Sequence, residues 1–153
     1  MIRTGYRAAY FLRSLYWRAF SPITLGVRAA IFDTRGHVLL VRHSYRPGWY
    51  MPGGGVDRRE TIRDALFREI WEEVGVVPQD EPQLVGVYTN LIEHKSDHVA
   101  LYAVRQFTIQ PQPNIEIAES GFFDPEALPG DVSPGTKRRL DEIAGRAPVA
   151  PIW

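Results

Sequence analysis

Three glutamates within five positions carry the most direct sign of chemistry in this sequence of 153 residues: Glu69, Glu72 and Glu73. They follow a run of three glycines, Gly53 to Gly55. Oxygen ligands of this kind suit Mg²⁺ or Mn²⁺, and Mg²⁺ usually keeps waters and uses substrate phosphates to complete its octahedron. The glycines supply backbone that a phosphate can approach closely. The segment therefore indicates a divalent-metal site beside a phosphate-binding loop.

A helix over residues 61–74 must position these carboxylates. The stretch contains neither Pro nor Gly, its apolar residues recur at a helical period, and Gly75 supplies a C-terminal stop. At about 100° per residue, Glu69 and Glu73 fall among the apolar positions of the helical wheel. Like charges four positions apart cost about 0.2–0.5 kcal/mol on an exposed helix, and partial burial increases the repulsion. We therefore expect positive charge close to both carboxylates.

The same segment fits a fixed pattern: Gly54, five residues, Glu60, seven residues, Arg-Glu-Ile, one residue, Glu-Glu, one residue and Gly-Val. It resembles the signature box of the Nudix hydrolases at every defining position. The resemblance implies a pyrophosphatase that uses Mg²⁺ or Mn²⁺ to cleave a nucleoside diphosphate linked to another group. The family commonly has glycine before the first box glutamate, where this sequence has Arg59. This departure puts the geometry of the loop from Asp57 to Glu60 in question.

The resemblance assigns metal-binding roles to three carboxylates and one carbonyl, those of Glu69, Glu72, Glu73 and Gly53. Arg68 resembles the residue that orients the glutamates, and Glu60 a structural or outer partner. In a later loop, Glu116 best matches the position from which the family often supplies one more carboxylate, and an ordinary solvated acid is the alternative. The catalytic candidates are thus Arg68, Glu69, Glu72 and Glu116. The general base is either Glu69 or Glu116, and the sequence does not choose between them.

Five residues are candidates for substrate binding. Gly54 and Gly55 offer exposed backbone to phosphates. Arg28 and Arg46 are cations suited to phosphate recognition, and Tyr50 can stack on a base. The expected ligand is a small nucleotide.

The identity of the substrate remains open at this stage. The leading hypothesis is a nucleoside diphosphate linked to another moiety, such as ADP-ribose or a nucleotide sugar. An alternative is a sanitation pyrophosphatase for non-standard nucleoside triphosphates, and one of another class is a nucleotide sensor that binds without cutting. The family's proline marker of ADP-ribose hydrolysis is absent, since no proline occurs between Pro82 and Pro111. The complete glutamate set argues against a sensor.

Composition narrows the remaining possibilities. The formal net charge is zero and charged residues make up 24% of the chain, so nothing supports bulk nucleic-acid binding. With no cysteine, neither a disulfide nor a thiol-ligated zinc site can form. No apolar run approaches the roughly 20 residues of a membrane-spanning helix. We expect a cytoplasmic protein.

The elements predict an α/β protein, with the mixed sheet and α/β/α sandwich that the resemblance also implies. Strands are expected at 24–33 and 37–43, paired as a hairpin, and a short one at 49–51. Further strands are expected at 83–93 and 99–109, joined by a polar loop, and at 121–123. A last helix should open at Ser133-Pro134 and run to about residue 144. We divide the chain into an N-terminal segment (1–22), a Nudix domain (23–146) and a tail (147–153).

The N-terminal segment lies outside the resemblance. Arginines alternate there with aromatic and aliphatic residues, and no acid occurs before Asp33. This composition predicts a basic amphipathic helix. We favour packing on the domain or on a second subunit in a homodimer, and contact with a membrane surface is the alternative.

Overall fold

The computed structural model describes residues 22–92 and 95–153. The amphipathic helix expected in the N-terminal segment falls outside them and stays a prediction. The described elements are, in chain order, β1 (Ile23–Ile31), β2 (Val38–His43), α2 (Ile62–Val74), β3 (Val76–Pro78), β4 (Gln83–Ile92), β5 (Lys95–Val104), β6 (Phe107–Ile109), β7 (Ile117–Phe123) and α3 (Pro134–Ile143). None of the helices in the described ranges is long and apolar enough to cross a membrane.

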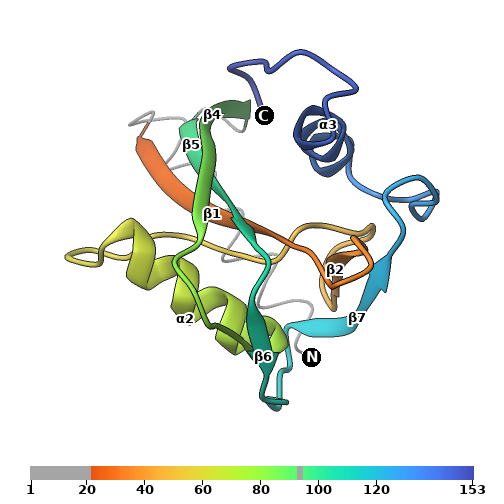
Figure 1. Ribbon diagram of the computed structural model, residues 1–153. Coiled ribbons are helices and arrows are strands. Elements are labelled where there is room, and N and C mark those ends of the chain that lie inside the picture. Colours follow the sequence, from red (N-terminus) through yellow and green to blue (C-terminus); the bar gives the residue numbers. More distant parts are fainter. Residues whose placement is uncertain (1–21, 93–94) are drawn as a thin grey trace.

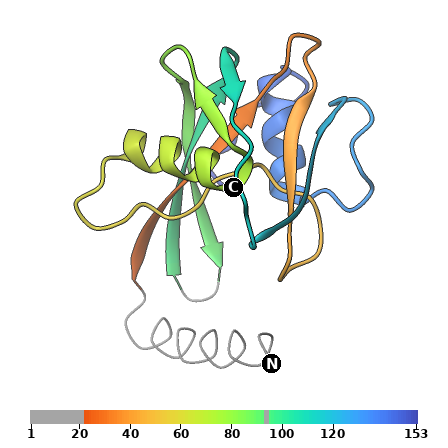
Figure 2. The same cartoon turned by 90° about the horizontal axis from the view of Figure 1, so that it is seen from below.

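A mixed three-stranded sheet lies at the centre of the molecule, in the order β1-β5-β4. Strands β1 and β5 are parallel, and β4 and β5 are antiparallel. Two antiparallel pairs, β2 with β7 and β3 with β6, complete the described strands. The two helices lie on opposite sides of the central sheet (Figures 1 and 2). The expected mixed sheet and α/β/α sandwich are thus confirmed.

Each helix buries its apolar side against a different face of this sheet. Ala65, Leu66 and Ile70 of α2 belong to one core cluster, together with Val27 and Ala29 of β1. On the other face, Leu140 of α3 packs in a second cluster with Ala30, Met51, Tyr88 and Leu101. Neighbouring residues of β1 therefore enter different cores, because successive side chains of a strand point to opposite faces.

The expected β1–β2 hairpin is wrong. The turn between the strands is present, but only Phe32 and Val38 form a bridge across it. The physical reason is that both edges of β1 are already occupied. Strand β5 covers one edge, and on the other the glycine loop donates and accepts backbone hydrogen bonds, with Gly54 O accepting from Val27 N at 2.9 Å. Strand β2 is therefore left to pair with β7.

Three other strand predictions are corrected in detail. The polar stretch expected as a loop is mostly strand, because Ser96, Asp97 and His98 pair on one side with β1 and on the other with β4. The expected strand at 99–109 is divided into β5 and β6, and β6 pairs with β3, which the sequence did not predict. Residues 49–51 are not a strand, since only Tyr50 and Trp49 form single bridges, to Val41 and Val132 respectively.

The helix boundaries follow their capping residues. Thr61 caps α2 by accepting from the backbone N–H of Asp64, and Gly75 ends the helix in the left-handed conformation with φ 67°. A Cβ at Gly75 would lie 2.0 Å from the carbonyl oxygen of Gln110, so this position has no room for a side chain. Ser133 caps α3 in the same way. The expected limits of both helices are confirmed.

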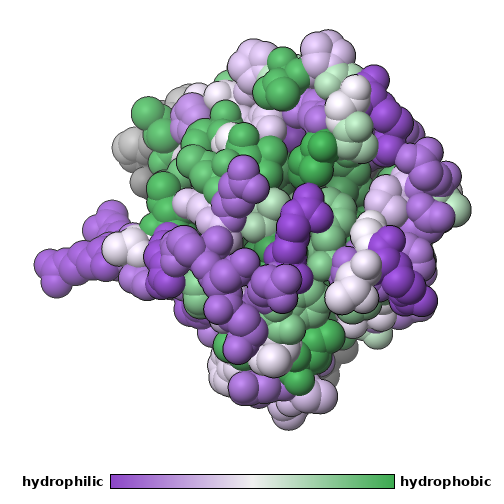
Figure 3. All heavy atoms as spheres, viewed as in Figure 1, coloured by the Kyte–Doolittle hydropathy of each residue, from purple (hydrophilic) through white to green (hydrophobic). Residues whose placement is uncertain are grey.

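An apolar patch is exposed on the central sheet beyond α2. Ile23, Val87 and Leu91, from β1 and β4, are all exposed large hydrophobic residues. Figure 3 shows hydrophobic side chains gathered in this region, at the upper left over β1, β4 and β5. Ile23 and Leu91 lie at the level where β1 begins, and Val87 lies further along the sheet, level with Val27.

Candidate active site

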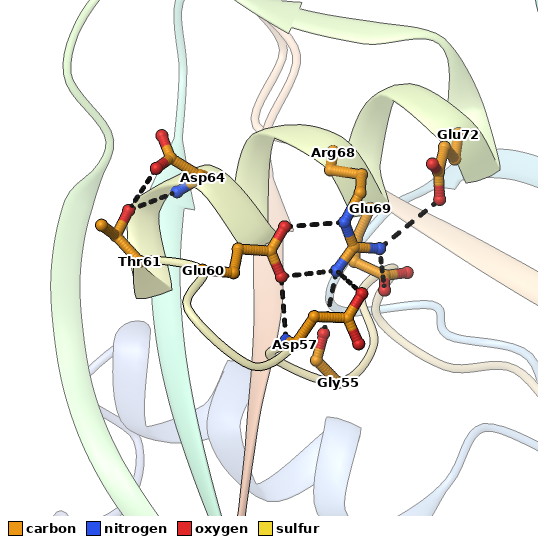
Figure 4. Close-up of polar contacts among 8 residues, drawn as sticks. All are labelled: Gly55, Asp57, Glu60, Thr61, Asp64, Arg68, Glu69 and Glu72. Atoms are coloured by element: carbon orange, nitrogen blue, oxygen red, sulfur yellow. Dashed lines mark hydrogen bonds and ion pairs between the residues drawn. The ribbon is translucent and has the colours of Figure 1, made fainter.

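Arg68 is the centre of the polar network on α2. Its guanidinium donates to both carboxylate oxygens of Glu60 at 2.8 Å and to Glu69 at 2.7 Å, and it lies 3.5 Å from Glu72. It also donates to the carbonyl of Gly55 at 3.1 Å. Figure 4 shows the arginine between these groups. One side chain thus joins the glycine loop, the loop glutamate and two helix glutamates.

The pair with Glu60 is the strongest part of this network. Hydrogen bonds from Arg68 lower the pKa of the Glu60 carboxyl to about 2, with help from the backbone N–H of Asp57. The same bond raises the pKa of Arg68 above its ordinary value. Both groups therefore stay charged near neutral pH, and the guanidinium that contacts Glu69 is held in one place.

The glycine loop lies directly against the helix carboxylates. A Cβ at Gly54 would be 2.4 Å from the carboxylate of Glu69, so only glycine leaves that carboxylate in position. Gly53 adopts φ 134°, and its backbone N–H donates to Glu73 at 2.8 Å. A Cβ at Gly53 would lie 2.3 Å from the carbonyl oxygen of Val27. At these two positions the backbone lies too close to its neighbours to admit a side chain. The phosphate approach expected from the three glycines stays a prediction.

Two of the helix carboxylates are removed from water. The side chains of Glu69 and Glu73 are 16% and 7% exposed, whereas Glu72 is 51% exposed. Burial raises the pKa of Glu73 to about 7, and the nearby Arg28 and Arg46 only partly offset it. Burial also raises the pKa of Glu69. The prediction that both carboxylates lie on the apolar side of the helix is confirmed.

A hollow of about 490 Å³ opens at the C-terminal half of α2. It is lined by the three helix glutamates and by a loop from β6 to β7 that carries Glu116. Asn114 joins this loop to the helix, since its amide donates to the carbonyl oxygen of Glu72 at 2.6 Å and accepts from the backbone N–H of Glu116 at 2.6 Å. The structure therefore brings Glu116 to the same hollow as the box glutamates.

The donor set suits a hard divalent cation. Glu69, Glu72 and Glu73 offer carboxylate oxygens to one hollow, as a hard divalent cation requires, and burial raises the pKa of Glu69 and Glu73. As the side chains lie, no three acidic or histidine groups of the described residues are gathered closely enough to hold a metal. The Glu69 carboxylate accepts a hydrogen bond from Arg68, and the Glu73 carboxylate accepts one from the N–H of Gly53.

The chain matches the family model of the NUDIX domain over residues 22–143. It belongs to the Nudix family. Among solved structures, a MutT NUDIX hydrolase from Burkholderia pseudomallei is similar with a TM-score of 0.70 and 26% identity, covering 79% of this chain and 98% of that one. An ADP-ribose pyrophosphatase from Streptococcus suis is similar with a TM-score of 0.56 and 27% identity, covering 82% of this chain and 94% of that one.

Two curated relatives match shorter parts of this Nudix chain. An RNA pyrophosphohydrolase from a Psychrobacter species is 38% identical over 63 residues, which are 41% of this chain and 36% of the relative. An uncharacterized Nudix hydrolase from Bacillus subtilis is 31% identical over 94 residues, which are 61% of this chain and 59% of the relative. The matches thus span between about a third and three fifths of the length of these two relatives.

His43 is a residue of this Nudix site that the sequence did not indicate. It is buried at the end of β2, with Nδ1 4.0 Å from a carboxylate oxygen of Glu73. Burial, with Arg46 and Arg28 nearby, lowers the pKa of His43 to about 4, so its ring is neutral at pH 7. The ring packs beside Tyr45 and Tyr50. No local pattern could have found it, because only the fold brings β2 beside α2.

A second hollow, of about 200 Å³, lies between the central sheet and the first turn of α3. Arg28, Arg46 and Tyr50, the three side chains predicted to bind substrate, all line it. The other lining residues are Met51, Asn90, Asp97, Val99, Ser133, Gly135, Thr136 and Trp153. We call this hollow the arginine pocket. Except for Arg28, Arg46 and Tyr50, its members were not predicted, because they come from the segment after β2, from β4 and β5, from the start of α3 and from the chain end.

The two arginines of this pocket point polar atoms into buried space. Nη1 of Arg28 and Nε of Arg46 are buried and have no hydrogen-bond partner among the described residues. The Arg46 guanidinium lies 3.8 Å over the ring of Tyr50. Burial and the neighbouring Arg28 lower the pKa of Arg46. Two adjacent cations with unused donors form a site that is complementary to an anion.

Arg59 accounts for the one departure from the Nudix box. It is the only residue other than glycine with positive φ in the described ranges, at 67°. The loop closes as Glu60 N donates to the carbonyl of Asp57 at 3.2 Å, and Asp57 N donates to the Glu60 carboxylate at 2.9 Å. The turn that glycine commonly makes in the family is therefore retained here with a strained arginine.

Proposed function

We propose that this protein is a metal-dependent pyrophosphohydrolase that cleaves a nucleoside diphosphate linked to another moiety. The observation that carries the proposal is the arrangement of the complete box. Arg68 orients Glu69, Gly53 and Gly54 lie against the carboxylates, and Glu73 is buried without full charge compensation. A structural or sensing role would not require this costly arrangement of half-buried acids.

The metal ligands would be Glu69, Glu72, Glu73 and the carbonyl of Gly53. Bound Mg²⁺ or Mn²⁺ supplies Lewis-acid chemistry, because it acidifies water and neutralises charge on phosphate oxygens. Arg68 fixes the direction of the Glu69 carboxylate, and the N–H of Gly53 fixes that of Glu73. These contacts leave little freedom to the two buried acids.

Glu116 is our choice for the general base. Glu69 accepts a hydrogen bond from Arg68 at 2.7 Å and would also bind the metal, so it is poorly placed to accept a proton. Glu116 faces the same hollow from a loop on the other side. A carboxylate there can take a proton from the water that attacks phosphorus, as the bond from phosphorus to the leaving phosphate oxygen breaks. Arg28 and Arg46 would hold the phosphates of the nucleotide.

Sanitation of non-standard nucleoside triphosphates is the second candidate, and the likeness to MutT proteins favours it. Relatives named RNA pyrophosphohydrolase and ADP-ribose pyrophosphatase add two further substrate classes to consider. All of these share a pyrophosphate bond joined to a nucleoside. The proposed chemistry is the same for each, and they differ in which phosphorus is attacked and in what leaves.

A substrate panel tests the proposal. ADP-ribose, nucleotide sugars, dinucleoside polyphosphates, nucleoside triphosphates and RNA with a 5′-triphosphate would each be incubated with Mg²⁺ and with Mn²⁺. We expect hydrolysis of at least one class, abolished by EDTA and restored by excess cation. Full activity in EDTA would show that the metal hypothesis is wrong. Hydrolysis of none of these substrates, with tight nucleotide binding, would favour the sensor.

A further inference from the structure

The end of the chain is built into the edge of the central sheet. Thr89 N donates to the carbonyl oxygen of Pro151 at 2.8 Å, and Trp153 N donates to that of Thr89 at 2.9 Å. Arg139 of α3 donates to the carbonyl oxygen of Ile152 at 2.8 Å. The C-terminus therefore lies beside β4 (Figure 1). These residues follow the part of the chain that matches the family model, which ends at residue 143.

The indole of Trp153 forms one wall of the arginine pocket. It packs edge-on against Tyr88, with ring centroids 5.8 Å apart. On the α3 side it lies against Gly135, where a Cβ would be only 2.4 Å from the indole nitrogen. The missing side chain at Gly135 is what lets the ring occupy this place. Backbone bonds, an aromatic neighbour and a glycine thus hold the ring in one orientation.

A nucleotide held in this pocket must extend beyond it. Pockets that enclose drug-sized ligands measure about 300–1,000 Å³, whereas this one has about 200 Å³. It has a flat aromatic wall at Trp153 and two cations with unused donors, Arg28 and Arg46. Both arginines are also close enough to lower the pKa of Glu73 on α2. A ligand that presents a planar ring to the wall and phosphates to the arginines would therefore reach towards the acidic hollow.

We propose that Trp153 is a specificity-determining residue, on whose indole the nucleobase of the substrate packs while Arg28 and Arg46 hold its phosphates. The proposal rests on the proposed function, because it assumes that the ligand is a nucleotide. It assigns the nucleobase site to the tail of the chain rather than to the box. The box then selects for pyrophosphate, and the tail for the nucleoside.

Binding measurements test this without relying on turnover. The full-length protein would be titrated with AMP, GMP, CMP and UMP, and separately with inorganic pyrophosphate, by calorimetry. Losing an aromatic stacking partner costs enough that Trp153→Ala should weaken the best-bound nucleotide about tenfold or more. Trp153→Phe should restore most of that affinity. Pyrophosphate should bind both variants about as well as it binds wild type.

Gly135→Ala supplies an independent variant in which the tryptophan is kept. The added methyl group must displace the indole, so we expect a loss of nucleotide affinity similar to that of Trp153→Ala. Combining the two changes should add little, because both remove the same wall. Val149→Ala, in an exposed part of the tail, is the matched control and should bind like wild type. Melting temperatures of all variants identify any loss of folding.

Several outcomes would overturn the proposal. The first is that Trp153→Ala binds nucleotides as tightly as wild type does. The second is that Trp153→Ala loses as much affinity for pyrophosphate as for nucleotides. The third is that the wild-type protein binds none of the four nucleotides. Failure of the proposed function looks different, because wild type would then bind nucleotides through Trp153 and hydrolyse none of the panel. In an active enzyme, Trp153→Ala should raise KM about tenfold and leave kcat within about threefold.

Discussion

The acidic hollow on α2 and the arginine pocket beneath α3 are built in opposite ways. The acidic hollow takes its three helix glutamates, its glycines and its orienting arginine from one continuous stretch, residues 53–73, and adds a single later loop. The arginine pocket collects side chains from residue 28 to residue 153, on three strands, a helix and the tail. Chemistry that needs fixed distances between several charges is therefore encoded locally, and ligand selection is distributed over the fold.

The two hollows also differ in charge, since carboxylates predominate in the acidic hollow and guanidinium groups in the arginine pocket. In the acidic hollow, burial raises the pKa of Glu73, and in the arginine pocket it lowers the pKa of Arg46. Each site is thus complementary to a ligand of the other sign, a cation in one and phosphate in the other. Because Arg28 and Arg46 also act on Glu73, filling one site should change the other. Three experiments test this contrast and a fourth tests the strained loop of the box, in decreasing order of expected effect.

Glu73→Gln should damage the acidic hollow most. The amide keeps the shape but removes a charge that the cation needs, and a metal contributes several kcal/mol to the transition state, or about 10²–10⁴ in rate. kcat/KM with the best substrate of the panel measures the loss. The fold should survive, because a neutral group suits this buried position better than a carboxylate. Glu81→Gln, at an exposed pair with Arg63, is the control and should keep full activity.

Glu116→Gln separates the base from the metal ligands. Losing a general base typically costs about 10²–10⁴-fold, so kcat should fall within that range with little change in Mg²⁺ affinity. Glu69→Gln should instead lower both kcat and the affinity for Mg²⁺. Titrating Mg²⁺ while measuring kcat for each variant distinguishes the two roles. A Glu116→Gln enzyme within a few-fold of wild type would return the base role to Glu69.

Proton release should accompany metal binding. The pKa of Glu73 is raised to about 7 from an ordinary 4.5, so in metal-free protein the carboxyl is protonated below pH 7. A cation must displace that proton, and its affinity should fall up to about tenfold per unit as pH drops below 7. The same raised pKa means that metal-free protein loses stability as pH rises from about 4.5 to 7.

Calorimetry of Mg²⁺ binding in buffers of different ionisation enthalpy counts the protons released. Glu73→Gln should release markedly fewer of them at pH 6.5. In Arg28→Met the pH dependence of Mg²⁺ binding should lie at higher pH than in wild type, because the substitution removes a charge that lowers the pKa of Glu73. An unchanged profile in Arg28→Met would mean that the two hollows act independently.

Arg59→Gly should have the smallest effect. Glycine adopts the positive φ of this position without strain but loses more entropy on folding, so we expect a gain in unfolding free energy of up to about 1 kcal/mol. Thermal melts would measure it. Arg58→Gly, at the preceding position, has no such strain to relieve and should be neutral or destabilising. A loss of stability in Arg59→Gly would show that the arginine side chain contributes contacts of its own.

The sequence alone determined the acidic site to a large extent. Residues one helical turn apart share a face wherever the helix lies, so the positions of Glu69 and Glu73 on the apolar side followed from period and spacing. The ends of α2 followed from Thr61 and Gly75, whose cap conformations are local properties.

Only the tertiary structure decided the rest, because strand pairing depends on which edges remain open. Strand β1 gives one edge to β5 and the other to the glycine loop, which excludes the hairpin that local turn residues favour. The fold also brings His43 beside Glu73 and places Trp153 in the same pocket as Arg28, although the members of these pairs are 30 and 125 positions apart. No local pattern encodes such contacts, since they depend on the free energy of the whole fold rather than on neighbouring residues.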